Sequence, residues 1–581
     1  MCGFAAFFSS FGPLPPPLSR PEPWIGLLRH RGPDAQASWA EPGAAIHFAR
    51  LSILDLSEQA MQPMRSSCRR YVIAFNGEIV NYRELADRYR VPFRGHSDTE
   101  VLLELYRQMG PAVIPELRGM YSFLIYDTQE RSVAAYRDPF GIKPLYYAQQ
   151  EDRLLVCSQI LPLLKALGGS SVRSSEVVRF LRSGEVDDGE ETLFERVQQL
   201  PAGQRLLWKG GNLRLERSGG AEFGPPRDLP DSGEKAEHSS YYETLMATIG
   251  EYLHADVPVG VSLSGGFDSS LLAHLVSRHP SGGAARTMFT RAYHDYEGNE
   301  LEAARQVSEA FGFDLHPVVL RLEEVPDLLR HCSRAQEQPV TSISILAYHK
   351  LYALARSMGI KVLLEGHGGD EIWAGYGCYR ENGAPQAGSQ DGSSFRMNEK
   401  ILLPEHSASA APSGTADLFP GVSPLARRQL RDLFGAKLQR SLRYVDRASM
   451  ENSVEVRVPY LDTRVALPAL TLPDRWKVRG EELRSFVRRM ALRALPGEIA
   501  LRPKVPIQDP QRKWLQRELR QYVEDVLNSD NLFISRFVDV SLLNQLYRQF
   551  LETPPQFDNL TFLVFPLFLE EWHRAMRDQC L

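Results

Sequence analysis

A cysteine stands at position 2, directly after the initiator methionine, in the opening stretch MCGFAAFF. Because cysteine is a small residue, we expect Met1 to be removed, so that Cys2 carries the free α-amino group of the mature chain. An α-amine with a pKa of about 7.7 to 8.0 can accept the proton of a thiol at neutral pH. The position therefore predicts a cysteine nucleophile with its own base, while a buried, unreactive cysteine is the alternative for this residue taken alone.

A second stretch that could do chemistry is SLSGGFDSS at 262–270. It follows an apolar run and precedes a helix-like stretch, so its glycines and serines would form a loop whose backbone N–H groups can surround phosphate oxygens. The loop lacks the lysine of the Walker pattern, and a plain strand-to-helix turn is the alternative. An acidic pair, Asp370 and Glu371, follows another apolar run and is expected at the same carboxyl edge of a parallel sheet. Asp268 and Asp370 could then share Mg²⁺.

The elements that must position these residues differ between the two halves of the chain. A length of 581 residues predicts two or more domains. Residues 71–159 contain strand-like runs, whereas strands and helices alternate from residue 241 onward, which indicates an α/β doubly wound parallel sheet followed by C-terminal helices. The polar, Gly/Pro-rich stretch 216–240 is predicted to be a linker, and 384–416 a mobile insertion in the domain at 241–581.

The composition argues against several classes of protein. A formal net charge of -5, without long runs of like charge, gives no reason to expect nucleic acid or a membrane surface as a partner. No apolar run reaches about 18 residues, so no transmembrane helix is predicted. The six cysteines are scattered without a CxxC pair, which argues against a zinc site and favours the reducing cytoplasm.

Five further stretches follow Cys2 in a fixed order: HRGPD, RLSILDL, FNGEIVNY, GHSDTE and RDPFGIKPLYY. Together with MCGF, they closely resemble the glutaminase domain of class II amidotransferases. The resemblance covers most of residues 2–200. It implies an α+β N-terminal-nucleophile fold, an αββα sandwich, for a glutaminase domain at 2–215.

This resemblance implies a role for each polar residue of the domain. The nucleophile would attack the side-chain amide of glutamine, and the Asn76 side chain and the Gly77 backbone N–H would stabilise the oxyanion, at about 3 to 4 kcal/mol for one donor. Arg50 is expected to bind the α-carboxylate of glutamine, and Glu78 and Asp98 its α-ammonium. Taken separately, each of these three charges could equally belong to a surface ion pair of little energetic value.

The loop at 262–270 resembles the pyrophosphate-binding loop of ATP pyrophosphatases, which split ATP to AMP and pyrophosphate to activate a carboxylate. The resemblance implies that Asp268 and Asp370 bind Mg²⁺. It also implies an ATP site formed by Leu263, Ser264, Gly265, Gly266, Asp268, Ser269 and Gly366.

Two later stretches carry the pattern of the same family. In RPKVPIQDP at 502–510, Lys504 matches a catalytic cation near the phosphates, where charge builds up on the departing pyrophosphate. In LRYVDRASMENSVEVRVPYLD at 442–462, Glu455 and Arg457 could take part in the site, although a structural ion pair is the favoured interpretation.

Both halves together resemble glutamine-dependent asparagine synthetase. The implied reaction releases ammonia from glutamine at Cys2, while ATP and Mg²⁺ convert an acceptor carboxylate into an acyl-adenylate that ammonia then attacks. Because ammonia in water is mostly protonated, a water-poor channel between the two sites is expected. The partners are thus glutamine, ATP and a small carboxylate, and a homodimer is possible.

The acceptor is the point at which the chain departs from the family. Typical asparagine synthetases carry a glutamate where this chain has His367, which makes His367 a candidate for acceptor specificity. Aspartate is the leading acceptor, and a sugar uronic acid or a natural-product carboxylate is the runner-up. A lactam-forming cyclase is less favoured, since such enzymes tend to lose the nucleophile. A non-catalytic protein should have lost Cys2, Asp268 or Asp370, and all three are present.

Overall fold

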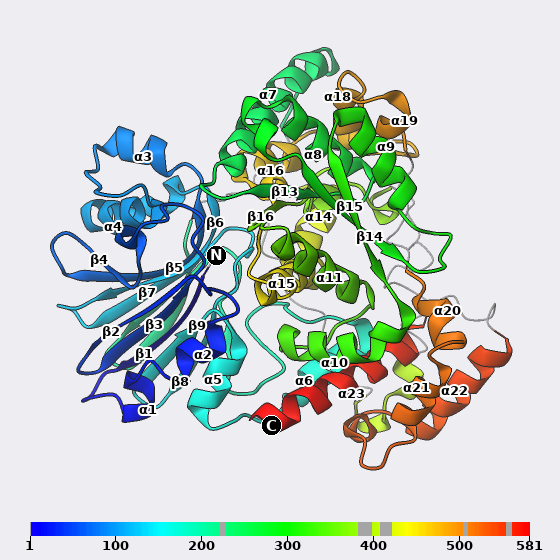
Figure 1. The fold of residues 1–581 in the computed structure, drawn as a ribbon, viewed down its shortest axis with the longest axis horizontal. Helices are drawn as coiled ribbons and strands as arrows, with labels where there is room; N and C mark the ends of the chain where they lie inside the picture. The colour runs from blue at the N-terminus through cyan, green and yellow to red at the C-terminus, as the bar shows by residue number, and fades with distance from the viewer. Residues whose placement is uncertain are drawn as a thin grey trace.

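The chain forms two domains side by side in the computed structural model (Figure 1). The structure describes residues 2–219, 225, 227–380, 398–406, 421–502, 509–553 and 560–580. The N-terminal domain is built on two antiparallel sheets, and the larger C-terminal domain on one parallel sheet. The predicted fold class is confirmed for both.

The N-terminal domain contains two six-stranded sheets. The first has the order β10 (Gln198–Gln199), β8 (Tyr146–Gln150), β9 (Arg153–Cys157), β1 (Gly3–Ser9), β3 (Ala44–Arg50) and β2 (Ala35–Glu41). The second has the order β12 (Asn212–Arg217), β11 (Gln204–Lys209), β7 (Ser132–Arg137), β6 (Gly119–Asp127), β5 (Tyr71–Ile79) and β4 (Met64–Arg65). Outer helices are α1 (Pro16–Ser19), α2 (Trp24–Leu28), α3 (Tyr82–Tyr89), α4 (Asp98–Met109), α5 (Ile160–Leu167) and α6 (Ser174–Ser183).

Strand β1 shows why the sheets stack as a sandwich. Phe4 and Phe8 face the second sheet and pack in one core cluster with residues of β5 and β6. Phe7, on the opposite face of the strand, packs instead with Trp24 and Leu28 of α2. Successive side chains of a strand point to opposite faces, so an entirely buried strand must have a layer on each side. The observed layers are helices, sheet, sheet, helices.

The parallel sheet of the C-terminal domain has the order β15 (Asp314–Leu320), β14 (Thr287–Tyr293), β13 (Val259–Ser262), β16 (Val362–Leu364) and β17 (Glu455–Arg457). From β13 the chain builds outward to β15 on one side and then to β17 on the other. The strand order therefore reverses between β13 and β16, and ligands of open α/β sheets bind at the carboxyl ends of such a switch point.

Helices cover both faces of this sheet (Figure 1). The main ones are α7 (Glu234–Leu253), α8 (Phe267–Arg278), α9 (Leu301–Phe311), α10 (Val325–Gln336), α11 (Ser344–Ser357), α14 (Pro424–Phe434), α15 (Ala436–Glu451), α16 (Thr463–Leu470) and α18 (Ser485–Ala491). The C-terminal helices are α20 (Gln511–Gln516), α21 (Arg520–Leu527), α22 (Val540–Glu552) and α23 (Thr561–Cys580). Helix α23 packs on α10 and also contacts α5 and α6 of the N-terminal domain.

The predicted linker and insertion are partly described. Within 216–240, β12 extends to Arg217 and α7 begins at Glu234, so regular structure enters the stretch from both ends. Of the predicted insertion at 384–416, only 398–406 belongs to the described residues. Its other residues lie outside them.

Buried charge pairs join the two domains. Arg31, after α2, donates two hydrogen bonds to Asp446 on α15, at 2.8 and 3.1 Å. Glu337 accepts the backbone N–H groups of Ile160 and Leu161 at 2.9 and 2.7 Å and pairs with Arg447 at 2.7 Å. The guanidinium groups are fully buried. Removing one partner of such a pair would leave an uncompensated charge, so the domains are held in one arrangement.

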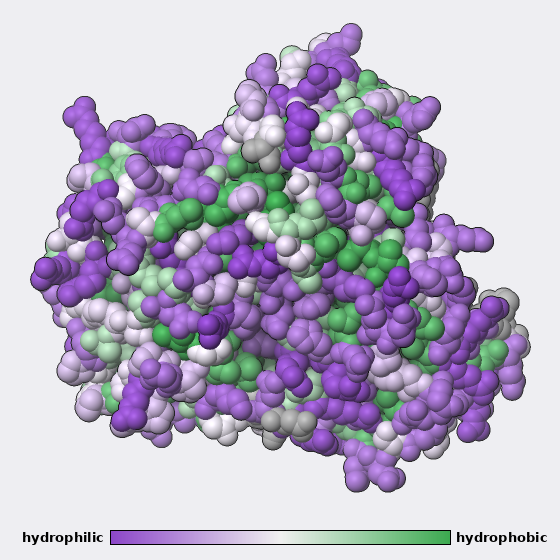
Figure 2. Space-filling model, viewed as in Figure 1, coloured by the Kyte–Doolittle hydropathy of each residue, from purple (hydrophilic) through white to green (hydrophobic). Residues whose placement is uncertain are grey.

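The face in Figure 2 is mostly hydrophilic, with hydrophobic side chains in small groups. Phe11, at 77% exposed, is the most exposed of the large hydrophobic residues that the structure describes. None of the described helices is both long enough and apolar enough to cross a bilayer.

Candidate active sites

Cys2 precedes β1 and lines a cavity of about 40 Å³, termed here the Cys2 cavity. Other polar positions in its wall are Arg50, Gly77, Glu78, Asp98 and Glu455. Burial raises the pKa of the Cys2 thiol, an effect opposed by the positive charge of the chain's amino terminus. The structure thus brings four of the residues expected around glutamine to the expected nucleophile.

Asn76 and Gly77 lie on β5 beside Cys2. Asn76 is fully buried; its Oδ1 accepts a hydrogen bond from the Cys2 backbone N–H at 3.2 Å, and its Nδ2 lies 3.5 Å from Ser122 Oγ. Gly77 has a φ of +154°, and a Cβ there would lie 2.1 Å from the carbonyl oxygen of Met120. A larger residue cannot adopt this backbone without moving β6, so glycine is required next to the nucleophile.

Arg50 and Asp98 occupy different environments in the cavity wall. The Arg50 guanidinium donates to the carbonyl oxygens of Ser57 at 2.7 Å and of Asp55, so it also orders the loop behind β3. Asp98 accepts the backbone N–H groups of Ile79 and Thr99 at 2.9 and 2.7 Å. Burial nevertheless raises the pKa of Asp98 to about 6.

Glu78 is paired across the domain boundary. Its carboxylate contacts the guanidinium of Arg457 on β17, and the same guanidinium donates from Nε to Glu455 at 2.7 Å. Glu455 and Arg457 do form an ion pair, but the pair reaches into the Cys2 cavity. Sequence reasoning missed Glu455 as a residue of this cavity. The signal that could have revealed it is the spacing of two residues between Glu455 and Arg457, which puts both side chains on one face of a strand.

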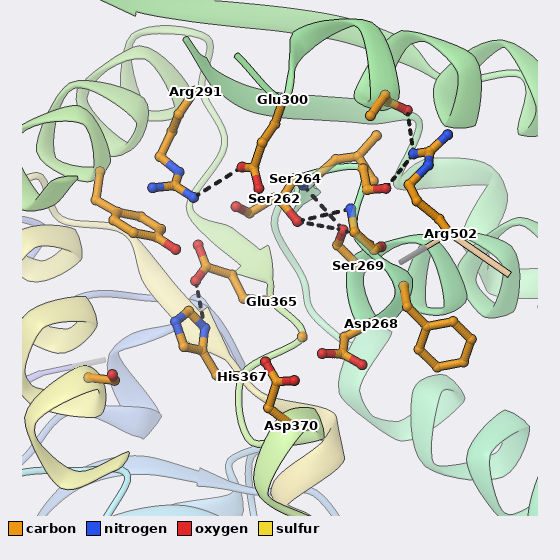
Figure 3. A pocket seen from close by; sticks show the side chains of 18 of the residues that line it. Ser262, Ser264, Asp268, Ser269, Arg291, Glu300, Glu365, His367, Asp370 and Arg502 are labelled. Atoms are coloured by element: carbon orange, nitrogen blue, oxygen red, sulfur yellow. Dashed lines mark hydrogen bonds and ion pairs between the residues drawn. The ribbon is translucent and has the colours of Figure 1, made fainter. Parts of the chain in front are cut away.

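The loop after β13 lines a second cavity of about 380 Å³, termed the Asp268 cavity (Figure 3). All the residues expected to bind ATP border it: Leu263, Ser264, Gly265, Gly266, Asp268, Ser269 and Gly366. The loop is braced by the two hydroxyls of Ser264 and Ser269, which lie 3.0 Å apart. Gly265 has a φ of +73°, and a Cβ there would lie 2.6 Å from the backbone of Ala303 on α9. Glycine therefore permits the close approach of loop and helix.

Asp268 and Asp370, the expected magnesium ligands, are bridged by an arginine. Arg484, directly before α18, lies 2.9 Å from Asp268 Oδ2 and also contacts Asp370. The two carboxylates are therefore close enough to share one cation. Asp268 Oδ1 is buried without a hydrogen-bond partner, which leaves it a lone pair for a ligand. This contact of Arg484 was not predicted, because more than 100 residues separate it from either carboxylate.

These two carboxylates fit a magnesium ion that phosphate oxygens help to coordinate. Mg²⁺ commonly binds one or two carboxylates and takes its other ligands from substrate phosphates and water. Within the described part of the chain, no group of three or more His, Cys, Asp or Glu side chains could hold a metal ion. Two carboxylates suit Mg²⁺ that is delivered with a nucleotide.

His367 lies on the opposite side of the cavity from the loop (Figure 3). Its Nδ1 is 3.0 Å from Glu365 Oε2, and the Tyr352 hydroxyl donates to Glu365 Oε1 at 3.0 Å. Arg291 is 8% exposed, lies 3.9 Å from the centre of the Tyr348 ring and is paired with Glu300 at 3.6 Å. This wall is polar and charged, so it could orient a polar acceptor.

The stretch around Lys504 is only partly described. Lys504 itself lies outside the described residues. Arg502, two residues earlier, lines the Asp268 cavity and donates to the carbonyl oxygen of Gly265 at 2.5 Å and to Gln306 at 2.8 Å. The described part of this stretch therefore borders the phosphate loop.

Comparison with known proteins gives a consistent result. The model of the asparagine synthase family matches residues 240–574, and that of a glutamine amidotransferase domain matches residues 1–218. Asparagine synthetase [glutamine-hydrolyzing] 1 of Bacillus subtilis is 27% identical, over 91% of this chain and 90% of its own. Amidase chry2 of Gibberella zeae is 30% identical, over 65% of this chain and 60% of its own. A solved glutamine phosphoribosylpyrophosphate amidotransferase from B. subtilis covers 54% of this chain and 65% of its own at 17% identity and a TM-score of 0.28, too weak a likeness for an argument.

Proposed function

Because the chain belongs to the asparagine synthase family, we propose that it makes asparagine from aspartate, with glutamine as nitrogen donor and ATP as activating nucleotide. The chain is a glutamine-hydrolysing ligase in which an amidotransferase domain precedes a synthase domain. The observation that carries the proposal is the pair of cavities in one chain: one lined by Cys2, the other by Asp268 and Asp370. Each contains polar side chains that suit its half-reaction.

In the Cys2 cavity, the thiolate of Cys2 would attack the side-chain amide carbon of glutamine. The thiol proton would pass to the α-amine of the processed chain, which Asn76 Oδ1 is placed to orient, at 3.2 Å from the Cys2 nitrogen. Asn76 Nδ2 and the Gly77 N–H would donate to the oxyanion. When the tetrahedral intermediate collapses, the amine would return the proton to the leaving nitrogen. Ammonia departs, and water then hydrolyses the thioester to glutamate.

In the Asp268 cavity, the backbone of the loop 262–270 would surround the phosphates of ATP. Asp268 and Asp370 would hold Mg²⁺, which supplies positive charge to the departing pyrophosphate. Arg484, which bridges the two carboxylates, could turn to the same phosphates, and Lys504 would add a second cation. The acceptor carboxylate would attack the α-phosphorus, and ammonia would attack the resulting acyl-adenylate and expel AMP.

The ammonia must cross from one cavity to the other. Protonated ammonia has no lone pair for attack, so the path has to exclude water. The buried interface supports such a path, because Arg31 of one domain and Asp446 of the other are paired there and fully or almost fully removed from water.

A natural-product or sugar carboxylate is the second candidate for the acceptor. His367 stands where the typical pattern has a glutamate, and one relative is named as an amidase. An intramolecular cyclase has less support, because the whole set around Cys2 is in place and a cyclase needs no ammonia.

A panel of acids tests the acceptor directly. Glutamine-dependent pyrophosphate release is measured with aspartate, then with hexuronates and aromatic acids, and the amide product is identified. The proposal expects aspartate to give AMP, pyrophosphate and asparagine in equal amounts. Turnover with another acid but not with aspartate would favour the second candidate, and cleavage of ATP to ADP would contradict the mechanism.

A further inference from the structure

The Cys2 cavity is completed by a residue from the other domain. Glu455 belongs to β17, the edge strand of the parallel sheet, yet it lines the cavity together with Glu78 and Asp98. We propose that Glu455 is a third carboxylate of the glutamine site and binds the α-ammonium group of the substrate. This inference rests on the proposed function, because it takes glutamine to be the ligand of the Cys2 cavity.

The position of Glu455 follows from how β17 is held. The backbone N–H of Glu455 donates to the carbonyl oxygen of Lys361 at 2.8 Å, which sets the strand in register beside β16. Arg457, two residues later on the strand, orients the Glu455 side chain by donating a hydrogen bond from Nε to Glu455 Oε1 at 2.7 Å. Arg457 is itself held in place, because its Nη1 donates to the backbone carbonyl oxygens of Tyr252 and His254 at 2.7 and 2.8 Å. The carboxylate of Glu455 is thus pre-positioned in the cavity wall.

The charges in the cavity favour an incoming ammonium group. Glu78, Asp98 and Glu455 are buried, at 3%, 6% and 1% exposed, and Arg457 is shared between two of them. Burial, and then the neighbouring carboxylates, hold the pKa of Glu78 well above its usual range despite Arg457. Burial opposes ionisation of Glu455, but the positive charges of the chain's amino terminus, Arg457 and Lys143 lower its pKa. Glu455 is therefore an ionised carboxylate in the wall, and an ammonium group is attracted to such a charge.

The covalent structure of glutamine places its ammonium group near these carboxylates. With the side-chain amide at Cys2 and the α-carboxylate at Arg50, the α-ammonium must lie on the same carbon as the carboxylate. The lining residues with negative charge are Glu78, Asp98 and Glu455. Glu455 would therefore let the synthase domain contact glutamine directly. Its strand is also joined to a lining residue of the other cavity, since the backbone N–H of Glu365 donates to the carbonyl oxygen of Arg457 at 2.9 Å.

The test removes the charge on either side of the contact. Glutamine is compared with glutaramate, which is glutamine without its α-amino group, as a substrate for hydrolysis by the full chain and by Glu455→Gln. Glu455→Gln should lower kcat/KM for glutamine about tenfold or more and leave kcat/KM for glutaramate nearly unchanged. Glu451→Gln is the matched control, because Glu451 lies four residues earlier and pairs with His30 and His331 outside the cavity.

A binding measurement gives the same answer without turnover. In the Cys2→Ala background glutamine is not consumed, and calorimetry should show a similar loss of glutamine affinity on adding Glu455→Gln but not on adding Glu451→Gln. If Glu455→Gln does not fold, as judged by loss of ammonia-dependent synthesis, Glu455→Asp replaces it and should reduce the preference for glutamine over glutaramate.

Equal losses for glutamine and glutaramate would overturn the inference, because they would mean that Glu455 acts only on the interface or on the α-amine of Cys2. An unchanged preference in Glu455→Asp would overturn it as well. Failure of the proposed function is a separate result. It would appear as absent pyrophosphate release with every acid, whatever the preference between the two ligands.

Discussion

The Cys2 cavity and the Asp268 cavity handle charge in different ways. The Cys2 cavity is small, about 40 Å³, and its carboxylate Glu78 is neutralised by Arg457 from the other domain. The Asp268 cavity is larger, about 380 Å³, and Arg484 of the same domain pairs with both of its aspartates. The first therefore depends on domain docking for its electrostatics, whereas the second is complete within one domain.

This difference matches the ligands that each cavity would take. A small cavity with charges already in place can select one amino acid by complementarity. The larger cavity must admit a nucleotide and an acceptor, and it sits at the switch point of an open sheet. We expect substitutions near Cys2 to act on glutamine use alone and substitutions near Asp268 to act on nucleotide chemistry.

The largest effect is expected at the nucleophile. Cys2→Ala should lower glutamine-dependent pyrophosphate release about 10⁴-fold or more, since no other group can form the thioester. Synthesis from added ammonium salts should persist. Cys68→Ala is the control, because Cys68 is an exposed free cysteine away from the cavity. Loss of both activities in Cys2→Ala would count against two separable cavities.

The reciprocal substitution is Asp268→Asn in the other cavity. It keeps the shape of the side chain but removes one of the two carboxylates, and we expect pyrophosphate release to fall about 10²- to 10³-fold. Glutamine hydrolysis should change little. Asp327→Asn, at an exposed ion pair with Arg330, provides the control. Unchanged pyrophosphate release would remove Asp268 from the magnesium site.

The dependence of the Cys2 cavity on docking is tested through Asp446→Asn. This change leaves Arg31 buried without its charge partner, at a cost of about 3 to 5 kcal/mol. Arg31 also donates to the Cys2 carbonyl oxygen at 3.1 Å, so glutamine hydrolysis should suffer more than ammonia-dependent synthesis. Thermal unfolding and the two activities are compared with Glu84→Gln, which affects only an exposed pair with Arg88 and a partly exposed one with Arg118. Equal behaviour of the two variants would contradict the role given to the interface.

The smallest effect is a pH dependence confined to the Cys2 cavity. Burial raises the pKa of Asp98 to about 6, and a protonated carboxyl group cannot pair with an ammonium group. Because the ionised form binds glutamine, protonation of Asp98 should add a fall of about tenfold per pH unit in kcat/KM for glutamine below pH 6, separate from the change near pH 8 that titration of the α-amine produces. Asp98→Asn should abolish the fall below pH 6. The same fall in Asp98→Asn as in the unaltered chain would show that Asp98 does not contact the substrate.

Several features of both cavities could be predicted from short stretches of sequence. Cys2, Arg50, Gly77 and Asp98 were expected together, and the structure places them around one cavity. The loop with Gly265 was expected between a strand and a helix, and it lies between β13 and α8. Their placement could be anticipated because each depends on local backbone geometry or on motifs read in order, whereas their roles stay predictions. The bridge by Arg484 and the entry of Glu455 into the Cys2 cavity were not predicted, because each joins segments that are distant in the chain.

The sequence by itself determined which residues are candidates for the chemistry, because the stretches FNGEIVNY and SLSGGFDSS can be read in order. The structure adds why two of their positions are glycine, since a positive φ and a close backbone approach at Gly77 and Gly265 exclude larger residues. Only the tertiary structure decided which charges meet. Arg31 and Asp446 are 415 residues apart in the chain, and Glu78 pairs with Arg457 of the other domain. Such pairs form because docking removes both groups from water, and each buried charge then requires a partner that no local pattern specifies.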